Sequence, residues 1–283
     1  RAFGVMRAGA AIRAAAARLD GVSDTARLDA ELLMAHLFGV TRSELLLRHM
    51  GDPAPEGFAA LVERRAAHEP VAYITGRQQF YGLELRVTPA TLIPRADSET
   101  LVAAALEAKP DAARVLDLGT GSGALLLAVL AHLGAAQGVG IDRCAAALSV
   151  ASDNAAALGL EARTRFALRD WTAPGWAEGL GAFDLILCNP PYVEEGAALA
   201  RQVHAFEPHG ALFAGADGLD AYRVLLPQVP GLMNPGAIAL VEIGARQAEA
   251  VSALAAAAGL EAELRRDLAA RPRVLVLRWA NHA

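Results

Sequence analysis

A neutral polar tetrapeptide ends one of the most apolar stretches of the sequence. The run at 185–188 is followed by Asn189, Pro190, Pro191 and Tyr192, none of which carries a charge at neutral pH. An asparagine side chain offers a carbonyl oxygen as a hydrogen-bond acceptor. Proline fixes its own φ and has no N–H, so the backbone carbonyl of Pro190 is held with little freedom. The tetrapeptide therefore presents two neutral acceptors beside a phenol ring.

Such acceptors suit a planar nitrogen, as in a carboxamide or an aromatic amine, whose lone pair is delocalised. This nitrogen cannot be activated by simple deprotonation near neutral pH. Asn189 and Pro190 can each accept one of its N–H groups and so aim it at a methyl group on a sulfonium. Both acceptors bind more strongly as the nitrogen becomes positive, which needs no general base. Tyr192 would stack on the flat substrate group. A plain turn is the alternative, because Asn-Pro is itself a turn signal.

A glycine-rich segment connects a predicted strand at 115–119 to a predicted helix at 122–134. Its residues are Gly119, Thr120, Gly121, Ser122 and Gly123. Glycines let the backbone turn sharply and approach a ligand closely, and a helix N-terminus offers free N–H groups. With Ala124 the segment also fits a relaxed dinucleotide pattern, so the glycines leave nicotinamide cofactors and S-adenosylmethionine both open. A purely structural turn is a third possibility.

Further polar and aromatic side chains follow the next predicted strands. Asp142 ends the strand at 138–142, where a carboxylate can accept hydrogen bonds from both ribose hydroxyls of an adenosine, and it can cap the next helix as well. Asp170 and Trp171 end the strand at 163–170. There an acid can meet the adenine amino group and an indole can lie on the ring face, although packing between domains would also explain the indole.

Strands and helices alternate from residue 115 onward. Strands are predicted at 115–119, 138–142, 163–170, 184–189, 237–244 and 273–279, with helices at 122–134, 144–157, 219–229 and 246–258. Such alternation is typical of an α/β fold with a parallel sheet, whose ligands bind at the carboxyl ends of the strands. The chemistry is therefore expected at residues 119, 142, 170 and 189.

The first quarter of the chain has helical periodicity and predicts a separate domain over 1–75. Helices are expected at 8–19, 27–38 and 55–68, with a short turn at 42–49. Asp24 or Thr25 would cap the second helix, and Thr41 would cap the turn. β-branched and aromatic residues alternate over 69–94 and predict a hairpin, which supplies a linker at 76–95. The catalytic domain would span 96–283, with Asp97 starting its first helix.

Composition bounds the remaining possibilities. The 283 residues are 54% hydrophobic, enough for one ordinary core and a smaller second one. The net charge of -5 gives no general attraction to nucleic acid. The longest apolar run, at 123–136, is too short to cross a bilayer. Scattered histidines predict no metal site. Cys144 and Cys188 are expected to be core residues in a reducing cytosol.

The amino terminus also resembles an organelle transit peptide, because residues 1–19 are rich in arginine and alanine and contain no acid before residue 20. A helix at 8–19 with an apolar stripe is the favoured interpretation. The sequence does not begin with methionine, so residues 1–5 are expected to be either upstream or added sequence.

With these residues placed, the sequence resembles the bacterial release factor glutamine methyltransferase family, known as PrmC or HemK, from about residue 8 onward. Its most specific blocks are DAELLMAHLFG (29–39), EPVAYITG (69–76), TLIPRADSETLV (91–102), DLGTGSGA (117–124), NPPY (189–192), FEPHGALFAGADGLDAYR (206–223) and VEIGARQ (241–247). NPPY alone is shared with adenine methyltransferases.

The resemblance implies a Rossmann-like class I methyltransferase with a mostly parallel seven-stranded sheet, a small amino-terminal helical domain and a connecting hairpin. It implies methyl transfer from S-adenosylmethionine to the side-chain amide nitrogen of the glutamine in the GGQ loop of class 1 peptide chain release factors. Residues 119–123, Asp142, Trp171 and Asn189 would hold the cofactor. Asp170 is added to this set only by its place at the end of the third strand. Residues 189–192 would hold the glutamine. A cytoplasmic monomer that binds no nucleic acid or membrane is expected.

The same resemblance places the segments 91–99 and 206–208 in the pocket wall, with Arg95 and Glu207 contacting the substrate, and gives the helical domain a role in docking the factor. The sequence departs from the family pattern at Ala96, Gln79 and Phe206, where proline, glutamate and tyrosine are common. These positions touch the pocket wall more than the reacting group, so they bear on substrate fit more than on catalysis.

Four alternatives are open. A sister enzyme methylates a glutamine of a large-subunit ribosomal protein, but the helical domain and the block at 91–99 favour the release factor. A DNA or RNA adenine methyltransferase would need a basic channel. A nicotinamide oxidoreductase would leave residues 189–192 unexplained. A noncatalytic adenosine-binding module is the remaining alternative.

Overall fold

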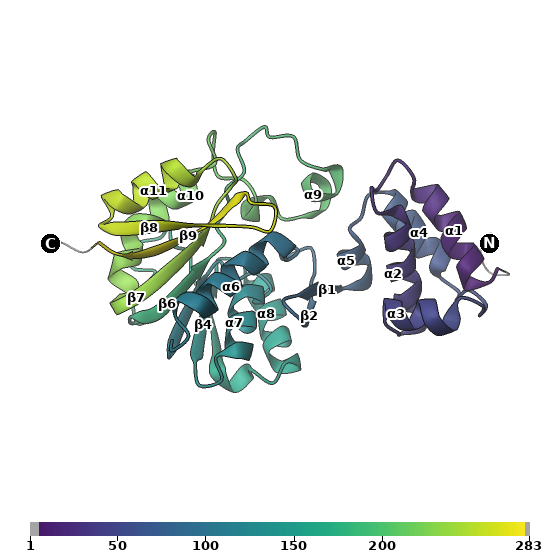
Figure 1. Ribbon diagram of the computed structural model, residues 1–283, viewed down its shortest axis with the longest axis horizontal. Coiled ribbons are helices and arrows are strands. Elements are labelled where there is room, and N and C mark those ends of the chain that lie inside the picture. The colour runs from purple at the N-terminus through teal and green to yellow at the C-terminus, as the bar shows by residue number, and fades with distance from the viewer. Residues whose placement is uncertain (1–5, 281–283) are drawn as a thin grey trace. The chain divides into compact units, whose positions relative to one another are not determined.

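The computed structural model describes residues 6–280, and its chain divides into two compact units. One unit runs to Arg77 and includes Leu199–Phe206, and the other comprises Gln78–Ala198 and the chain from Glu207 onward. Figure 1 shows helices alone in the first unit and a helix-covered sheet in the second. The expectation for residues 1–5 lies outside the described residues.

The first unit is built from short helices around one apolar core. Its elements are α1 (Ala8–Leu19), α2 (Ala26–Phe38), α3 (Arg42–Glu44), a π-helical turn (Leu45–His49), α4 (Phe58–Ala66), α5 (Val71–Thr75) and α9 (Arg201–Phe206). Ile12, Leu33 and Phe58 are fully buried where α1, α2 and α4 meet. The periodicity of the sequence predicted these three helices because their apolar residues recur on one face.

Two caps of this unit differ in how well they were predicted. The Thr41 hydroxyl accepts a hydrogen bond from the Glu44 N–H at 3.2 Å, as expected. Thr25 stands at the start of α2 but makes no capping bond, because its hydroxyl donates to Asp29 at 2.9 Å instead. Asp24 does not cap α2 either. The prediction of a side-chain cap on α2 was therefore wrong.

The second unit contains a sheet of seven strands among the described residues. The strands are β3 (Arg114–Leu118), β4 (Gln137–Asp142), β5 (Thr164–Leu168), β6 (Phe183–Cys188), β7 (Met233–Glu242), β8 (Leu260–Arg266) and β9 (Pro272–Trp279). They lie side by side in the order β5-β4-β3-β6-β7-β9-β8. Strand β9 runs antiparallel to β7 and β8, the other pairs are parallel, and the order reverses between β3 and β6. This is a mostly parallel, Rossmann-like sheet, as expected.

Helices cover both faces of this sheet, as Figure 1 shows. One face packs against α6 (Glu99–Ala108), α7 (Ala124–His132) and α8 (Ala145–Ala157), and the other against α10 (Asp220–Leu225) and α11 (Ala248–Ala257). Alternate residues of one strand enter opposite cores, such as Val115 and Leu116 of β3. Burial on both faces explains why the central strands are continuous apolar runs in the sequence.

Two expectations for this part of the chain were wrong, and one strand was missed. Residues 71–75 form α5 and not the first arm of a hairpin, because Pro70 precedes a helical turn that ends at Gly76 with a φ of 72°. The hairpin is confined to β1 (Arg77–Phe80) and β2 (Leu83–Arg86). Strand β8 was not predicted. Asp97 does not cap α6, because its carboxylate pairs with Arg271 at 3.2 Å and Arg273 at 2.9 Å.

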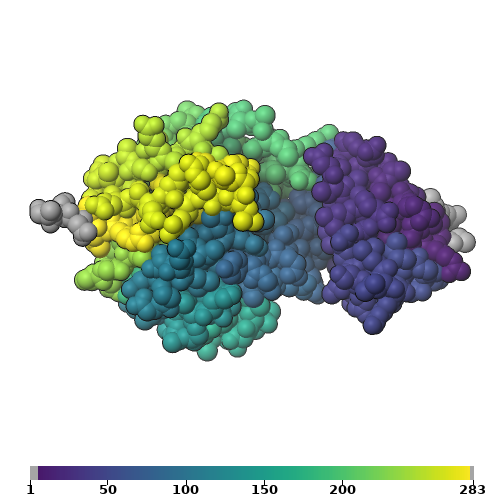
Figure 2. All heavy atoms as spheres, in the orientation of Figure 1, coloured from purple at the N-terminus to yellow at the C-terminus, as the bar shows by residue number. Residues whose placement is uncertain are grey.

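The carboxyl-terminal hairpin lies beside α6 although more than 150 residues separate them in sequence. Figure 2 shows its yellow surface directly against the blue surface of the earlier segment. Arg265 pairs with Glu107 at 3.3 Å, in addition to the ion pairs of Asp97. The hairpin therefore fixes the start of α6, which borders the site described below.

The first unit contains a buried ion pair whose loss would be costly. Arg65 and Asp29, 3% and 6% exposed, are joined by a hydrogen bond of 2.7 Å. We expect Arg65→Met to destabilise this unit by about 3–5 kcal/mol, because it leaves a buried charge unpaired. Hydrogen exchange of the amides of residues 8–66 measures the change.

Arg18→Met is the matched control, because the Arg18–Glu63 pair is more than half exposed. Its loss should cost less than about 1 kcal/mol. Equal protection factors in the two variants would contradict the larger contribution of the buried Arg65–Asp29 pair to stability.

Candidate functional site

The ends of three neighbouring strands bring the predicted residues to one edge of the sheet. Leu118, the last residue of β3, pairs in parallel with Ile141 of β4 and with Cys188 of β6. Gly119 follows Leu118, Asp142 follows Ile141, and Asn189 follows Cys188. They therefore lie at the carboxyl edge where the strand order reverses, which is the usual ligand site of open α/β sheets.

Backbone bonds hold the glycine turn in place. The N–H groups of Gly119 and Thr120 both donate to the Ile141 carbonyl, at 2.9 and 2.8 Å. Gly119, Gly121 and Gly123 have φ values of 75°, 55° and 82°, which side chains with a Cβ rarely adopt. The turn therefore requires glycine at each of these positions.

Asp142 joins this turn to the next helix. Its Oδ2 accepts the Gly121 N–H and its Oδ1 accepts the Cys144 N–H, both at 2.9 Å. The carboxylate thus supports the turn and fixes the residue before α8, but it does not cap the helix, because Cys144 holds the N-cap position and no side chain makes a capping bond there. Each oxygen keeps a further lone pair, which leaves capacity for ribose hydroxyls. Its cofactor role stays a prediction.

The indole of Trp171 lies on the glycine turn. A Cβ on Gly119 would stand 3.1 Å from Cη2 of this ring, so the side chain packs directly on glycine backbone. The neighbouring Asp170 accepts two hydrogen bonds from Thr172 through one oxygen, and the first of these, from the N–H, is the main cause that lowers the pKa of Asp170. Asp170 is therefore ionised at neutral pH, with its other oxygen free of these bonds.

A buried acid that the sequence analysis missed lies beneath the turn. Asp117 is 1% exposed, and its Oδ2 accepts the Thr120 hydroxyl at 2.6 Å. Its Oδ1 has no hydrogen-bond partner among residues 6–280. Burial raises the pKa of Asp117 to about 7. An acid two residues before the first glycine of the turn was the available signal.

The tetrapeptide is fastened by side chains from distant segments. Nδ2 of Asn189 donates a long hydrogen bond of 3.4 Å to the Ser98 hydroxyl, and the Tyr192 hydroxyl donates to Oε1 of Glu242 at 3.2 Å. Ser98 and Glu242 are 3% and 1% exposed. Ser98 belongs to the segment 91–99 that was expected to wall the pocket, and it lines the cavity described below, but its contact with Asn189 was not predicted. No role was predicted for Glu242, although it is an acid at the end of the apolar strand β7.

The backbone after the tetrapeptide is also fixed. The Tyr192 carbonyl accepts the side-chain amide of Gln247 at 3.0 Å, and the Val193 N–H donates to Leu212 at 2.8 Å. Gly218, with a φ of 70°, approaches so closely that a Cβ there would lie 2.3 Å from the Tyr192 carbonyl oxygen. The position of Tyr192 is therefore set by its main chain as well as by its hydroxyl.

The two predicted substrate contacts pair with each other. Arg95 Nη2 lies 2.5 Å from Oε1 of Glu207, whose Oε2 accepts the Ile93 N–H at 3.1 Å. Glu207 is 4% exposed and Arg95 is partly exposed. The ion pair thus ties the segment before α6 to the segment after α9. Contact of these residues with a substrate stays a prediction.

A cavity of about 500 Å³ opens between these segments. The predicted residues that line it are Arg95, Gly119, Thr120, Gly121, Ser122, Asp142, Asp170, Trp171, Asn189 and Pro191. The other predicted residues, Gly123, Pro190, Tyr192 and Glu207, are not part of the lining formed by the described residues. Cys144, expected in the core, is partly exposed and lines the cavity, because it precedes α8. The volume suits a nucleoside-sized group.

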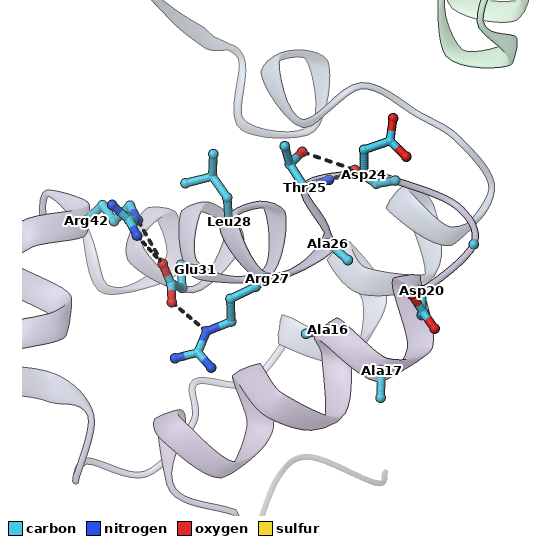
Figure 3. Close-up of a pocket in the computed structure, with 12 residues that line it drawn as sticks. Ala16, Ala17, Asp20, Asp24, Thr25, Ala26, Arg27, Leu28, Glu31 and Arg42 are labelled. Carbon is cyan, nitrogen blue, oxygen red and sulfur yellow. Dashed lines mark hydrogen bonds and ion pairs between the residues drawn. The ribbon is translucent and has the colours of Figure 1, made fainter.

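A second cavity, of about 680 Å³, lies between α1 and α2 of the helical unit. Figure 3 shows Arg27 and Arg42 reaching Glu31 from two sides. The contacts are 2.5 and 2.7 Å, and although burial opposes them, they lower the pKa of Glu31. The charges of Arg27, Arg42 and Glu31 already pair with one another. This open groove is therefore a weaker candidate for chemistry than the smaller cavity.

No group of three His, Cys, Asp or Glu side chains within residues 6–280 could hold a metal ion. No helix of the same range is long and apolar enough to cross a membrane. The strand order, the glycine turn with its supporting acid, and the neutral tetrapeptide together define a Rossmann-like class I methyltransferase.

Comparisons with known proteins agree with this class. The family models described as "PrmC N-terminal domain" and "Methyltransferase domain" match residues 10–76 and 109–256. Release factor glutamine methyltransferases from Cereibacter sphaeroides, Rhodospirillum rubrum and Caulobacter vibrioides are 47%, 44% and 42% identical. The alignments cover 90%, 89% and 91% of this chain and 92%, 78% and 91% of those proteins. The chain belongs to the release factor glutamine methyltransferase family.

Among solved structures, a protein-(glutamine-N5) methyltransferase from Alicyclobacillus acidocaldarius has 25% sequence identity and a TM-score of 0.42. The match covers 69% of this chain and 99% of that one. At this TM-score the superposition adds nothing to the family assignment.

The close approach at Gly218 predicts a large effect of one added methyl group. Gly218→Ala combines a strained φ with a clash against backbone, so we expect it to cost clearly more than the roughly 1–2 kcal/mol of strain alone. Gly159→Ala is the matched control, because its φ is 69° and nothing lies within 4 Å of the added Cβ. Denaturant unfolding followed by tryptophan fluorescence compares them, since all three tryptophans belong to the second unit. Equal midpoints would contradict the prediction.

The buried Asp117 predicts a pH-dependent stability. Its folded pKa of about 7 lies above the ordinary value of 3.8, so the folded protein binds an extra proton between these values. Stability relative to Asp117→Asn should therefore fall as the pH rises from 5 to 8, by at most about 1.4 kcal/mol per pH unit. Urea unfolding at several pH values measures this slope.

Asp184→Asn is the control for that slope. Although burial opposes it, hydrogen bonds from Asn234, Arg114 and Ala113 lower the pKa of Asp184. This carboxylate is ionised in both states above pH 5, so the stability difference from wild type should be flat there. If the stability difference between wild type and Asp117→Asn also stayed constant from pH 5 to 8, the pKa of Asp117 would not be raised.

Proposed function

We propose that the protein transfers a methyl group from S-adenosylmethionine to the side-chain amide nitrogen of the glutamine in the GGQ motif of class 1 peptide chain release factors. The relatives that cover most of the chain carry the name release factor glutamine methyltransferase. One observation of the structure supports the chemistry most directly. The glycine turn after β3 and Asn189 after β6 follow paired residues of adjacent strands and line the same cavity.

The residues present fit the proposed cofactor. The turn at 119–123 offers a backbone that an adenosyl group can approach closely, the Trp171 ring covers one side, and Asp142 retains lone pairs for ribose hydroxyls. When bound, S-adenosylmethionine supplies an electrophilic methyl group. The partner in this reaction is a weakly nucleophilic amide nitrogen, which the chain's own residues must hold and polarise.

Asn189 and Pro190 carry this task in the proposed mechanism. The Asn189 side-chain oxygen and the Pro190 carbonyl each accept one N–H of the substrate amide. As the amide nitrogen gains positive charge, these two hydrogen bonds strengthen, and the barrier falls without a general base. The methylated amide cation is strongly acidic and gives its extra proton to water after the transfer. Tyr192 would contact the flat amide group. Its hydroxyl bond to Glu242 restricts how the ring can move.

The partner and the setting complete the proposal. The helical unit is proposed to dock the release factor, and α2 offers Leu28 and Leu32, which are 38% and 37% exposed and one helical turn apart. Arg95 and Glu207 would border the docked loop. We further propose that the protein acts as a cytoplasmic monomer and binds neither nucleic acid nor membrane.

The activity is tested with purified protein, S-adenosylmethionine carrying a labelled methyl group, and three substrates. A class 1 release factor should gain one methyl group on the GGQ glutamine, located by mass spectrometry of its peptides. A large-subunit ribosomal protein and duplex DNA should gain little or none. Preferential labelling of the ribosomal protein would favour the sister enzyme, and labelling of DNA would refute a glutamine-specific reaction.

The role of Asn189 is tested by removing its acceptor. Asn189→Ala should lower kcat on the release factor by about a hundredfold, because one preorganised acceptor is lost. Asn234→Ala is the matched control, because this asparagine bonds Asp184 at the opposite end of the sheet. Near-normal turnover of Asn189→Ala would refute the assignment.

A further inference from the structure

Two buried polar side chains behind the tetrapeptide have no part in the mechanism so far. Ser98 comes from the turn that begins α6, and Glu242 is the last residue of β7. Ser98 accepts a hydrogen bond from Asn189, and Glu242 accepts one from Tyr192. Among the neighbours of the Glu242 carboxyl, whose burial raises its pKa, the Ser98 hydroxyl acts in the opposite sense by hydrogen bonding. Two hydrogen-bonded pairs, Asn189 with Ser98 and Tyr192 with Glu242, are therefore linked only by the nearness of Ser98 to Glu242, because no hydrogen bond of ordinary geometry joins these two residues within the described part of the chain.

The direction of these bonds decides how the Asn189 carboxamide faces. A carboxamide has a donor end and an acceptor end, and only its oxygen can receive an N–H of a substrate amide. A serine hydroxyl has one proton and two lone pairs. If that proton is committed to the Glu242 carboxylate, Ser98 can only accept from Asn189. Nδ2 then faces Ser98, and Oδ1 is left for the substrate.

Glu242 is placed to hold that proton. It is 1% exposed, and its Oε2 has no hydrogen bond of ordinary geometry within the described residues. A buried carboxylate oxygen without a partner costs free energy, so a nearby hydroxyl that donates to it stabilises the fold. The Tyr192 hydroxyl already donates to Oε1, and the positive charge of Arg273 stabilises the ionised form of Glu242.

We propose that Ser98 and Glu242 are positioning residues that fix the orientation of the Asn189 carboxamide for catalysis. This inference rests on the proposed function, because it gives Asn189 the role of an acceptor for the substrate amide. Neither residue lies between the substrate and the methyl donor in this scheme. Both act on the orientation of the Asn189 carboxamide, and the glycine turn keeps its contacts, so their loss should change turnover far more than cofactor binding.

The first test is Ser98→Ala, which removes the hydroxyl and little volume. We expect kcat on the release factor to fall about tenfold, because the carboxamide can then turn its NH₂ group to the substrate. The dissociation constant of S-adenosylmethionine, measured by calorimetry, should stay within about twofold, since the glycine turn is untouched. Tyr222→Phe is the matched control. The Tyr222 hydroxyl donates to the Glu242 backbone carbonyl at 2.8 Å and does not contact the side chains of Asn189 or Ser98 by a hydrogen bond. The kcat of this variant should equal that of wild type.

The second test asks whether the two residues act as one unit. Glu242→Gln keeps the shape of the side chain and an oxygen for Tyr192, but its amide can donate to Ser98 and remove the enforced direction. It should lower kcat by about tenfold, and the double variant with Ser98→Ala should be no worse than either single variant. Losses that multiply in the double variant would indicate two independent structural effects and overturn the proposal.

The outcomes separate this proposal from the function on which it rests. A kcat for Ser98→Ala within twofold of wild type, with Asn189→Ala still a hundredfold slower, would reject the positioning role and keep the proposed function. Failure of the wild-type protein to methylate a release factor would reject both.

Discussion

The parallel pairing of β3 with β6 is the constraint on which the site depends. Because Leu118 is opposite Cys188, the chain leaves both strands at the same level, and the residues that follow open into one cavity. The strand order reverses at this pair, so the helices after the two strands cover opposite faces of the sheet and leave a crevice between them. A one-residue slip in this pairing would turn every side chain of β6 to the wrong core and carry Asn189 away from the glycine turn.

Buried acids support the parts of the site that a ligand would touch. Asp117 lies under the glycine turn and Glu242 lies behind the tetrapeptide, each about 1% exposed. Each receives a hydroxyl from the segment that it supports, Thr120 in one case and Tyr192 in the other. Apolar residues would stabilise these positions more simply, since buried charge is expensive. Their presence beneath the two turns that line the cavity indicates that geometry at the cavity is gained at the expense of stability.

The sequence predicted the parts of the fold whose pattern is local. The central strands are apolar runs because both faces are buried, and the motifs at 119–123 and 189–192 follow them directly. Strand β8 was missed because LEAELRR alternates with charge at the edge of the sheet and looks polar in isolation. The residues of α5 favour strands, but Gly76 and the burial of Ile74 in the helical core select a helix. Tertiary packing decided both cases.

The support of the site could not be predicted for a different reason. Ser98 and Asn189 are 91 positions apart, and Tyr192 and Glu242 are 50 apart, so no spacing reveals either contact. What connects them is a physical requirement. A carboxylate at the position of Asn189 would be a stronger acceptor, but it would also pair with a sulfonium in the ground state and so stabilise the reactants along with the transition state. A neutral amide avoids that loss but has two orientations. Placing the charge one hydroxyl behind it, at Glu242, selects the useful orientation while the group at the reacting atoms stays neutral.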